Sequence, residues 1–105
     1  MSLSIHHQET DSTSAVIILN GRLLLGAPCQ ELERMVADLL GGGFRQITFD
    51  IAGLSHIDST GIGRFIDAYS KLRAAGGTMH IKGAMGAVRD MFRVTRLDTV
   101  LPVEP

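Results

Sequence analysis

The hydrophobic residues of this chain change their spacing along the sequence, from every second position to every third or fourth and back. In residues 46–54, Ile47, Phe49 and Ile51 alternate with more polar residues, and residues 78–82 repeat the alternation. A spacing of two predicts a strand with one face on the core, whereas a spacing of three to four predicts an amphipathic helix. Because helical segments separate the strands, we expect an α/β fold whose strands pair in parallel through right-handed crossovers.

Three segments have the spacing of a helix. The first covers about residues 28–40, where Pro28 suits the first turn and a run of glycines follows the last. The second starts at the motif IDSTGIG and ends near AAGG, and the third covers residues 84–93. Cys29 extends the apolar stripe of the first helix by one turn, so we interpret it as a small buried hydrophobic residue. The residues predicted to face the core are Leu32, Met35, Val36 and Leu39, then Ile62, Phe65, Ile66, Tyr69 and Leu72, and finally Met85, Val88, Met91 and Phe92.

The remaining strands are predicted near the two ends. Residues 3–9 and 15–25 are separated by the turn cluster 11–14, so we expect these two strands to be antiparallel. The unbroken apolar start of the second predicts a strand that is covered on both sides or central in the sheet. A short last strand is predicted at residues 99–103. The order β-β-α-β-α-β-α-β therefore predicts a mixed, mostly parallel sheet with helices mainly on one face, in a single domain of residues 1–105.

Composition excludes several classes of function. The net charge is −1, from 10 basic and 11 acidic residues, which offers no electrostatic basis for binding nucleic acid. The longest apolar run, residues 15–19, is too short to cross a membrane. One cysteine cannot form an internal disulfide, and the first residues lack the pattern of a signal peptide. We therefore expect a cytoplasmic protein without membrane insertion.

Residues 54–65, LSHIDSTGIGRF, contain residue types that are used in catalysis. His56, Asp58 and Ser59 match the members of a hydrolase triad, but a triad needs side chains that converge from separate segments. Neighbours at the end of a strand point in different directions. The hydrolase pattern G-x-S-x-G also fails, because Ile57 stands in place of its first glycine. We therefore predict that the protein is not an enzyme.

The sequence gives little support for a metal site or a nucleotide site. The four histidines, His6, His7, His56 and His80, lack the spacing of metal ligands, so no metal and no cofactor are predicted. The glycines of STGIG open a helix, and helix N-termini attract phosphate. No lysine follows them as in a P-loop, and the pattern G-x-G-x-x-G is incomplete. A small nucleotide-binding protein is kept as an alternative.

Ser59 is predicted to be the N-cap of the second helix, because its hydroxyl can accept a hydrogen bond from a free backbone N–H of the first turn. This role does not explain Gly61 and Gly63, each of which costs roughly 0.5–1 kcal/mol in a helix relative to alanine. A first turn with few side chains leaves the backbone accessible. We therefore predict a docking surface, or a site where a kinase reaches a hydroxyl.

The motif resembles the D-S-[ST]-G-[ILV]-G signature of STAS-domain proteins, the bacterial anti-sigma-factor antagonists. LNGRL is similar to the G-x-L turn after the second strand of this family, and ITFDIAGLSHIDSTG to its third strand and phosphorylation loop. AVRDMFRVTRLDTVL is similar to the closing helix and the short strand after it. Leu24 stands where many relatives have an acid, and Arg96 where they have a glycine. The resemblance covers nearly the whole chain and implies a STAS-like α/β domain.

The resemblance also implies a mechanism. Members of the family bind an anti-sigma factor that is also a serine kinase, and the unphosphorylated form frees the sigma factor. The phosphorylated serine corresponds to Ser59, with Thr60 as the second choice, and a phosphatase resets the switch. The residues expected to contact the partner are Asp58, Ser59, Thr60, Gly61, Ile62 and Leu24. A constitutive STAS adaptor, in a signalling scaffold or a lipid-transport complex, is the alternative with the same fold.

Overall fold

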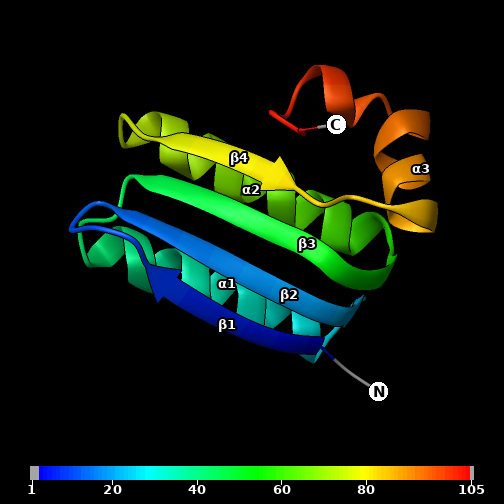
Figure 1. Ribbon diagram of the computed structural model, residues 1–105, viewed down its shortest axis with the longest axis horizontal. Coiled ribbons are helices and arrows are strands. Elements are labelled where there is room, and N and C mark those ends of the chain that lie inside the picture. Colours follow the sequence, from blue (N-terminus) through cyan, green and yellow to red (C-terminus); the bar gives the residue numbers. More distant parts are fainter. Residues whose placement is uncertain (1–2, 105) are drawn as a thin grey trace.

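The computed structural model describes residues 3–104 and follows the predicted order of elements except at the end (Figure 1). The helices begin and end within about two residues of the predicted positions, because their apolar stripes and glycines mark them. The elements are β1 (Leu3–Glu9), β2 (Ser14–Leu23), α1 (Ala27–Gly41), β3 (Gln46–Ile57), α2 (Ser59–Ala74), β4 (Thr78–Lys82), α3 (Gly86–Val94) and the 3₁₀-helix η1 (Leu97–Thr99).

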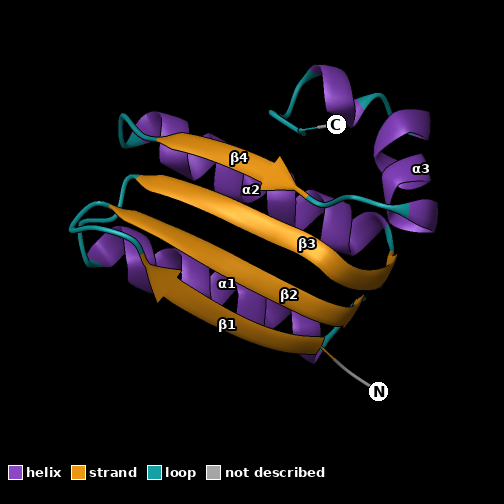
Figure 2. Ribbon diagram, viewed as in Figure 1, coloured by secondary structure: helices purple, strands orange, loops and turns teal. Residues whose placement is uncertain are grey.

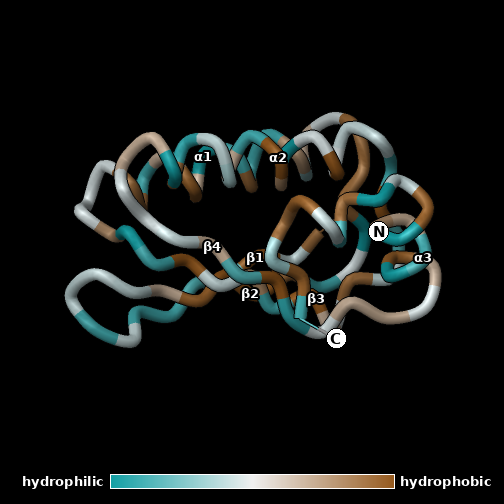
Figure 3. The backbone as a smooth tube through the Cα atoms, turned by 90° about the horizontal axis from the view of Figure 1, so that it is seen from above, coloured by the Kyte–Doolittle hydropathy of each residue, from teal (hydrophilic) through white to brown (hydrophobic). Residues whose placement is uncertain are grey.

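The strands form one sheet in the order β1-β2-β3-β4. β1 and β2 are antiparallel, while β3 is parallel to both β2 and β4. These pairings confirm the mixed, mostly parallel sheet that the alternation of strands and helices predicted. α1 and α2 lie side by side on one face of the sheet, and α3 lies at one end, beside the end of β3 (Figures 2 and 3).

The predicted last strand is wrong in extent. Only Val103 pairs with the sheet, in a single parallel bridge to Ile81. The Ile81 N–H donates to the Pro102 carbonyl over 2.9 Å, and the Glu104 N–H donates to the Ile81 carbonyl over 2.7 Å. Pro102 has no N–H of its own, and the Leu101 N–H is used by the carbonyl of Leu97 in η1. The backbone before Val103 therefore cannot continue a ladder.

β2 is central in the sheet but only one of its faces is buried. Ala15, Ile17 and Leu19 are at most 2% exposed and face the helices, whereas Val16 and Ile18 on the opposite face are half-buried. The unbroken apolar run of β2 thus reflects its central position, one of the two options that the sequence left open. It does not reflect a second layer of helices.

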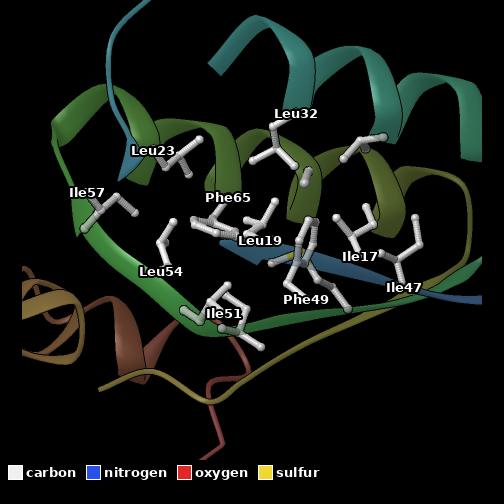
Figure 4. Close-up of a cluster of buried hydrophobic side chains, with 14 of the residues drawn as sticks. Ile17, Leu19, Leu23, Leu32, Ile47, Phe49, Ile51, Leu54, Ile57 and Phe65 are labelled. Atoms are coloured by element: carbon white, nitrogen blue, oxygen red, sulfur yellow. The ribbon is translucent and has the colours of Figure 1, made fainter. Parts of the chain in front are cut away.

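The core lies between the sheet and the helices (Figure 4). Phe65 of α2 is fully buried; its ring is 5.2 Å from that of Phe49 on β3, nearly perpendicular to it, and 5.7 Å from that of Phe92 on α3. The edge-on contact with Phe49 and the tilted contact with Phe92 add to the stabilisation from buried apolar area. Phe65 therefore joins α2 to the sheet and to α3, and so positions the start of α2.

Two residues predicted to face the core are exposed. Met85 is 58% exposed because it precedes α3, and Ile66 is 39% exposed because it lies at the edge of the apolar stripe of α2. Arg96 has a φ of 59°, in the left-handed region. This conformation explains why a glycine is common there in the family that the sequence resembles.

Candidate functional site at the start of helix α2

The motif lies where β3 ends and α2 begins, at the carboxyl edge of the parallel strands. The Asp58 N–H donates to the carbonyl of Leu23, the last residue of β2, over 3.4 Å. α1 follows β2 after a short loop, so the N-termini of α1 and α2 lie at the same edge of the sheet (Figure 1). Two helix N-termini, each with partial positive charge, are therefore close to Asp58.

The N-cap of α2 is Asp58, so the prediction that Ser59 caps the helix is wrong. Asp58 has the extended backbone of a cap residue, and its Oδ1 accepts a hydrogen bond from the Gly61 N–H over 2.9 Å. Its Oδ2 accepts a second bond from the Leu25 N–H over 2.9 Å. Asp58 thus ties the loop between β2 and α1 to the start of α2.

Ser59 is the first residue of α2 and is exposed. Because Asp58 makes the capping bond, the Ser59 hydroxyl has no hydrogen-bond partner within the described residues 3–104. Thr60 is half-buried and lies on the side of α2 that carries Arg64, four residues later. Arg64 binds Glu33 of α1, so this side of α2 faces α1. Ser59 therefore presents the more accessible hydroxyl of the pair.

Hydrogen bonds keep Asp58 ionised. Partial burial alone would raise the pKa of this carboxyl, but the backbone N–H groups of Gly61, Leu25 and Thr60 outweigh it and hold the pKa below its ordinary value of 3.8. A full negative charge therefore lies one residue before Ser59 at neutral pH.

The pKa of the Cys29 thiol is raised, by burial first and also by the nearby charge of Asp58; the residue is 4% exposed. Cys29 is buried as predicted.

Replacing Asp58 with alanine is expected to lower the free energy of unfolding by roughly 2 kcal/mol at pH 7, about 1 kcal/mol from the cap and a similar amount from the bond to Leu25. Since the carboxyl has a lowered pKa, its contribution is complete above the unfolded value of 3.8 and is lost as the pH falls through the lower folded value. Urea unfolding from pH 7 to pH 2 measures this difference. Asp90→Ala, on the exposed side of α3, is the control and should cost little. A difference between wild type and Asp58→Ala that did not shrink in acid would contradict the assignment.

Two residues of the predicted contact set lie beneath the surface. Ile62 is 6% exposed and packs in the core. Gly61 is also buried, and a Cβ atom there would come within 2.6 Å of the Leu23 carbonyl oxygen and 2.8 Å of the Ile57 side chain. Gly61 therefore allows α2 to approach the ends of β2 and β3 closely. A Cβ atom on Gly63 would meet nothing within 4 Å, so Gly63 is the glycine that leaves the surface bare.

The two glycines should respond differently to the same substitution. Gly61→Ala is expected to lower the free energy of unfolding by about 1–3 kcal/mol, because a backbone carbonyl cannot move aside as a side chain can. Gly63→Ala is expected to raise it by roughly 0.5–1 kcal/mol through helix propensity. Chemical unfolding of the two variants side by side measures both effects. Equal effects of the two substitutions would contradict the packing described for Gly61.

The apolar surface near Ser59 comes from residues outside the contact set that the sequence predicted. Leu24 is half-buried, and its carbonyl accepts a weak hydrogen bond from the Cys29 thiol. Leu25 is 75% exposed, and its N–H is the group that binds Asp58. Residues 23–25 are all leucine, so the sequence pattern cannot tell which of them is exposed. The exposure of Leu25 follows from the end of β2 at Leu23.

Leu25, Ser59, Gly63 and Ile66 together are called the α2 surface below. Ile66 lies seven residues after Ser59, two turns along the same side of α2, about 10 Å away along the axis. The α2 surface thus combines the Ser59 hydroxyl, the turn without side chains at Gly63 and two exposed apolar side chains. Leu25 precedes Ser59 in the sequence, and Ile66 follows it. Such a surface suits contact with another protein.

The arrangement does not form a catalytic triad. His56 Nδ1 lies 2.8 Å from the Ser55 hydroxyl, and that hydroxyl also lies 2.9 Å from the Gly21 carbonyl. His56 is therefore engaged by Ser55 and not by Ser59. Across residues 3–104, no three His, Cys, Asp or Glu side chains come together as a metal site would require. Within the same range, none of the helices has the length and apolar character needed to cross a membrane.

Known proteins resemble this chain in both sequence and fold. The chain is 27% identical over 73 residues to the anti-sigma-B factor antagonist of Staphylococcus aureus, a match that covers 70% of this chain and 68% of that protein. The solved structure of an anti-sigma factor antagonist from Mycobacterium paratuberculosis superposes with a TM-score of 0.83 at 19% identity, over 99% of this chain and 86% of that one. The phosphorylated form of the Bacillus cell fate determinant SpoIIAA superposes with a TM-score of 0.76 at 18% identity, over 97% and 92% of the two chains. The model of the STAS domain family matches residues 5–105, nearly the full length of the sequence. The protein belongs to the STAS domain family.

Proposed function

We propose that the protein is an anti-sigma-factor antagonist that binds a kinase-type anti-sigma factor and is switched off by phosphorylation of Ser59. The observation that carries the proposal is the exposed Ser59 hydroxyl, free of hydrogen bonds within residues 3–104, at the first position of α2. The anti-sigma-B factor antagonist of Staphylococcus aureus and the phosphorylated structure of SpoIIAA support it. In this role the protein is a binding module and a substrate, acts in the cytoplasm and needs no cofactor.

Accessibility favours Ser59 over Thr60 as the acceptor. A kinase must place the hydroxyl oxygen in line with the γ-phosphorus of ATP. Ser59 is exposed and precedes the bare turn at Gly63, whereas Thr60 is half-buried on the side of α2 that faces α1. In the transfer, a bond forms between Ser59 Oγ and the γ-phosphorus, ADP leaves, and the hydroxyl proton passes to a base of the kinase. A phosphatase reverses the modification by hydrolysis.

The electrostatics of the site favour a switch that leaves the fold intact. A phosphate adds about −1.5 to −2 charges at pH 7, and the N-terminus of α2 stabilises negative charge locally. The partner instead meets that phosphate next to the ionised Asp58, on a surface otherwise made of a bare turn and the apolar residues Leu25 and Ile66. Desolvating the added charge on docking is costly. A penalty of only ~1.4 kcal/mol already lowers affinity tenfold.

The partner footprint in this proposal is the α2 surface, with Asp58 and Thr60 at its edge. Leu24, Gly61 and Ile62 support it from below: Ile62 and Gly61 are buried, and Leu24 is half-buried. Leu25 takes the place that the sequence suggested for Leu24 as the exposed apolar contact. Residue 24 carries no acid, so the loop between β2 and α1 adds no carboxylate beside Asp58.

Phosphate mapping tests the proposal. The protein is incubated with a purified kinase-type anti-sigma factor and ATP, and the modified residue is identified by mass spectrometry. One phosphate on Ser59 is expected, with none on Ser59→Ala and an unchanged yield on Thr60→Ala. A kinase that binds tightly yet leaves Ser59 unmodified would overturn the switch. Recovery of transport subunits in affinity purification would favour the constitutive adaptor, and tight stoichiometric binding of ATP or GTP in calorimetry would favour a nucleotide-binding protein.

A further inference from the structure

A groove of about 460 Å³ lies between β1 and α1, on the side of the fold formed by the first strand. Its apolar lining includes Ile5, Met35, Leu39 and Phe44, of which Ile5, Met35 and Phe44 are only partly buried. It shares no residue with the α2 surface. The volume falls within the range of sites that bind small ligands or peptide side chains.

β1 borders the groove and is an edge strand (Figure 1). Among the described residues it pairs with β2 alone, in a register that runs without a bulge from Leu3 opposite Gly21 to Glu9 opposite Ala15. It contains neither proline nor lysine, residues with which proteins commonly protect a sheet edge. The opposite edge, β4, is partly covered by the bridge to Val103. β1 can therefore accept another strand.

The charges around the groove indicate the chemistry of that strand. Three carboxylates, those of Glu9, Glu31 and Asp38, line it together with one guanidinium, that of Arg34, so the net charge is −2 with His7 neutral. A basic segment is complementary to this rim. A second copy of the chain is not, because β1 itself carries Glu9 and no basic residue other than histidine, and a two-fold axis would bring two acidic rims together.

We propose that the groove is a docking site for an extended, basic segment of a partner protein, which adds a strand to the free edge of β1. Alternate residues of the added strand point to the helix side of the sheet. An apolar residue there enters the groove beside Ile5 and Met35, and basic residues two positions before and after it lie about 13 Å apart. Glu31 and Asp38 are separated by about 10 Å along α1, so long basic side chains reach both.

The test uses the full chain and the seven-residue peptide TRTLTRT, which carries arginine, leucine and arginine on one face. Titration of isotope-labelled protein, followed by amide chemical shifts, is expected to show saturable changes concentrated in β1 and in the exposed side of α1. The double substitution Glu31→Lys and Asp38→Lys is expected to weaken binding at least tenfold. Asp90→Lys on α3 is the matched control and should leave the affinity within twofold.

Three results would overturn the proposal. One is the absence of saturable shifts up to millimolar TRTLTRT. Another is equal affinity for TETLTET, in which glutamate replaces arginine, because binding would then not depend on the acidic rim. The third is a concentration-dependent shift of β1 amides without peptide, since it would assign the strand edge to a second copy. Ser59→Asp should leave peptide affinity unchanged, which separates this site from the proposed switch.

Discussion

Replacing Ser59 with aspartate is expected to lower the affinity for a kinase-type anti-sigma factor at least tenfold. The added carboxylate lies next to Asp58, which is already ionised, and both charges must lose water when the partner covers the α2 surface. Isothermal titration calorimetry with wild type and variant measures the loss. The free energy of unfolding should change by no more than about 0.5–1 kcal/mol, and toward greater stability, because negative charge at a helix N-terminus is favourable.

Ser70→Asp is the matched control for this experiment, because Ser70 is exposed on the same helix but far from its N-terminus. It should leave the affinity within about twofold. Ser59→Ala should bind as tightly as wild type and remain bound when ATP is added, since it cannot be modified. Equal binding of Ser59→Asp and wild type would show that charge at this position does not control the complex.

Replacing Phe65 with alanine is expected to lower the free energy of unfolding by about 3–5 kcal/mol. The ring is fully buried and contacts both Phe49 and Phe92, so its removal leaves a cavity where α2, β3 and α3 meet. A loss of this size is a large part of the total stability of a small domain. Urea unfolding at 25 °C measures it, with circular dichroism reporting the folded fraction.

Phe44→Ala is the control for Phe65→Ala, since it removes the same side chain from a half-buried position beside the groove. We expect it to cost less than half as much. If the two variants were equally destabilised, the core would not be centred on Phe65 as the structure places it. Because Phe65 positions α2, its removal should also slow the phosphorylation of Ser59 under conditions where the variant is still folded.

Local patterns account for much of the fold. β4 has the bounds that the spacing of two predicted, and β1 has the bounds predicted for the short run before the turn cluster. The antiparallel pairing of β1 with β2 follows from the short turn between them, and the parallel pairings follow from the helices in between. The last segment was predicted wrongly because apolar residues at 99–103 satisfy a strand pattern, whereas Pro102 and the bond from Leu101 to Leu97 prevent a ladder.

The site was predictable in part. The motif and its resemblance to a family predicted Ser59 as the modified residue, which stays a prediction, and the structure gives the residues around it other roles than the predicted ones. Asp58 rather than Ser59 caps α2, Leu25 rather than Leu24 is exposed, and Gly61 serves packing while Gly63 leaves the surface bare. Each distinction depends on where one backbone lies against another, such as the Leu23 carbonyl beside Gly61.

The sequence by itself determined the class of fold, the order of elements and the residue on which the proposed switch depends, because periodicity and a short motif are local properties. Only the tertiary structure decided which hydroxyl is the more exposed, which leucine is exposed and that an acidic groove lies beside β1. Those features arise where the ends of β2, β3, α1 and α2 meet, or where β1 borders α1. These features depend on contacts between residues that are far apart in the chain, and the spacing of residues within a segment does not predict such contacts.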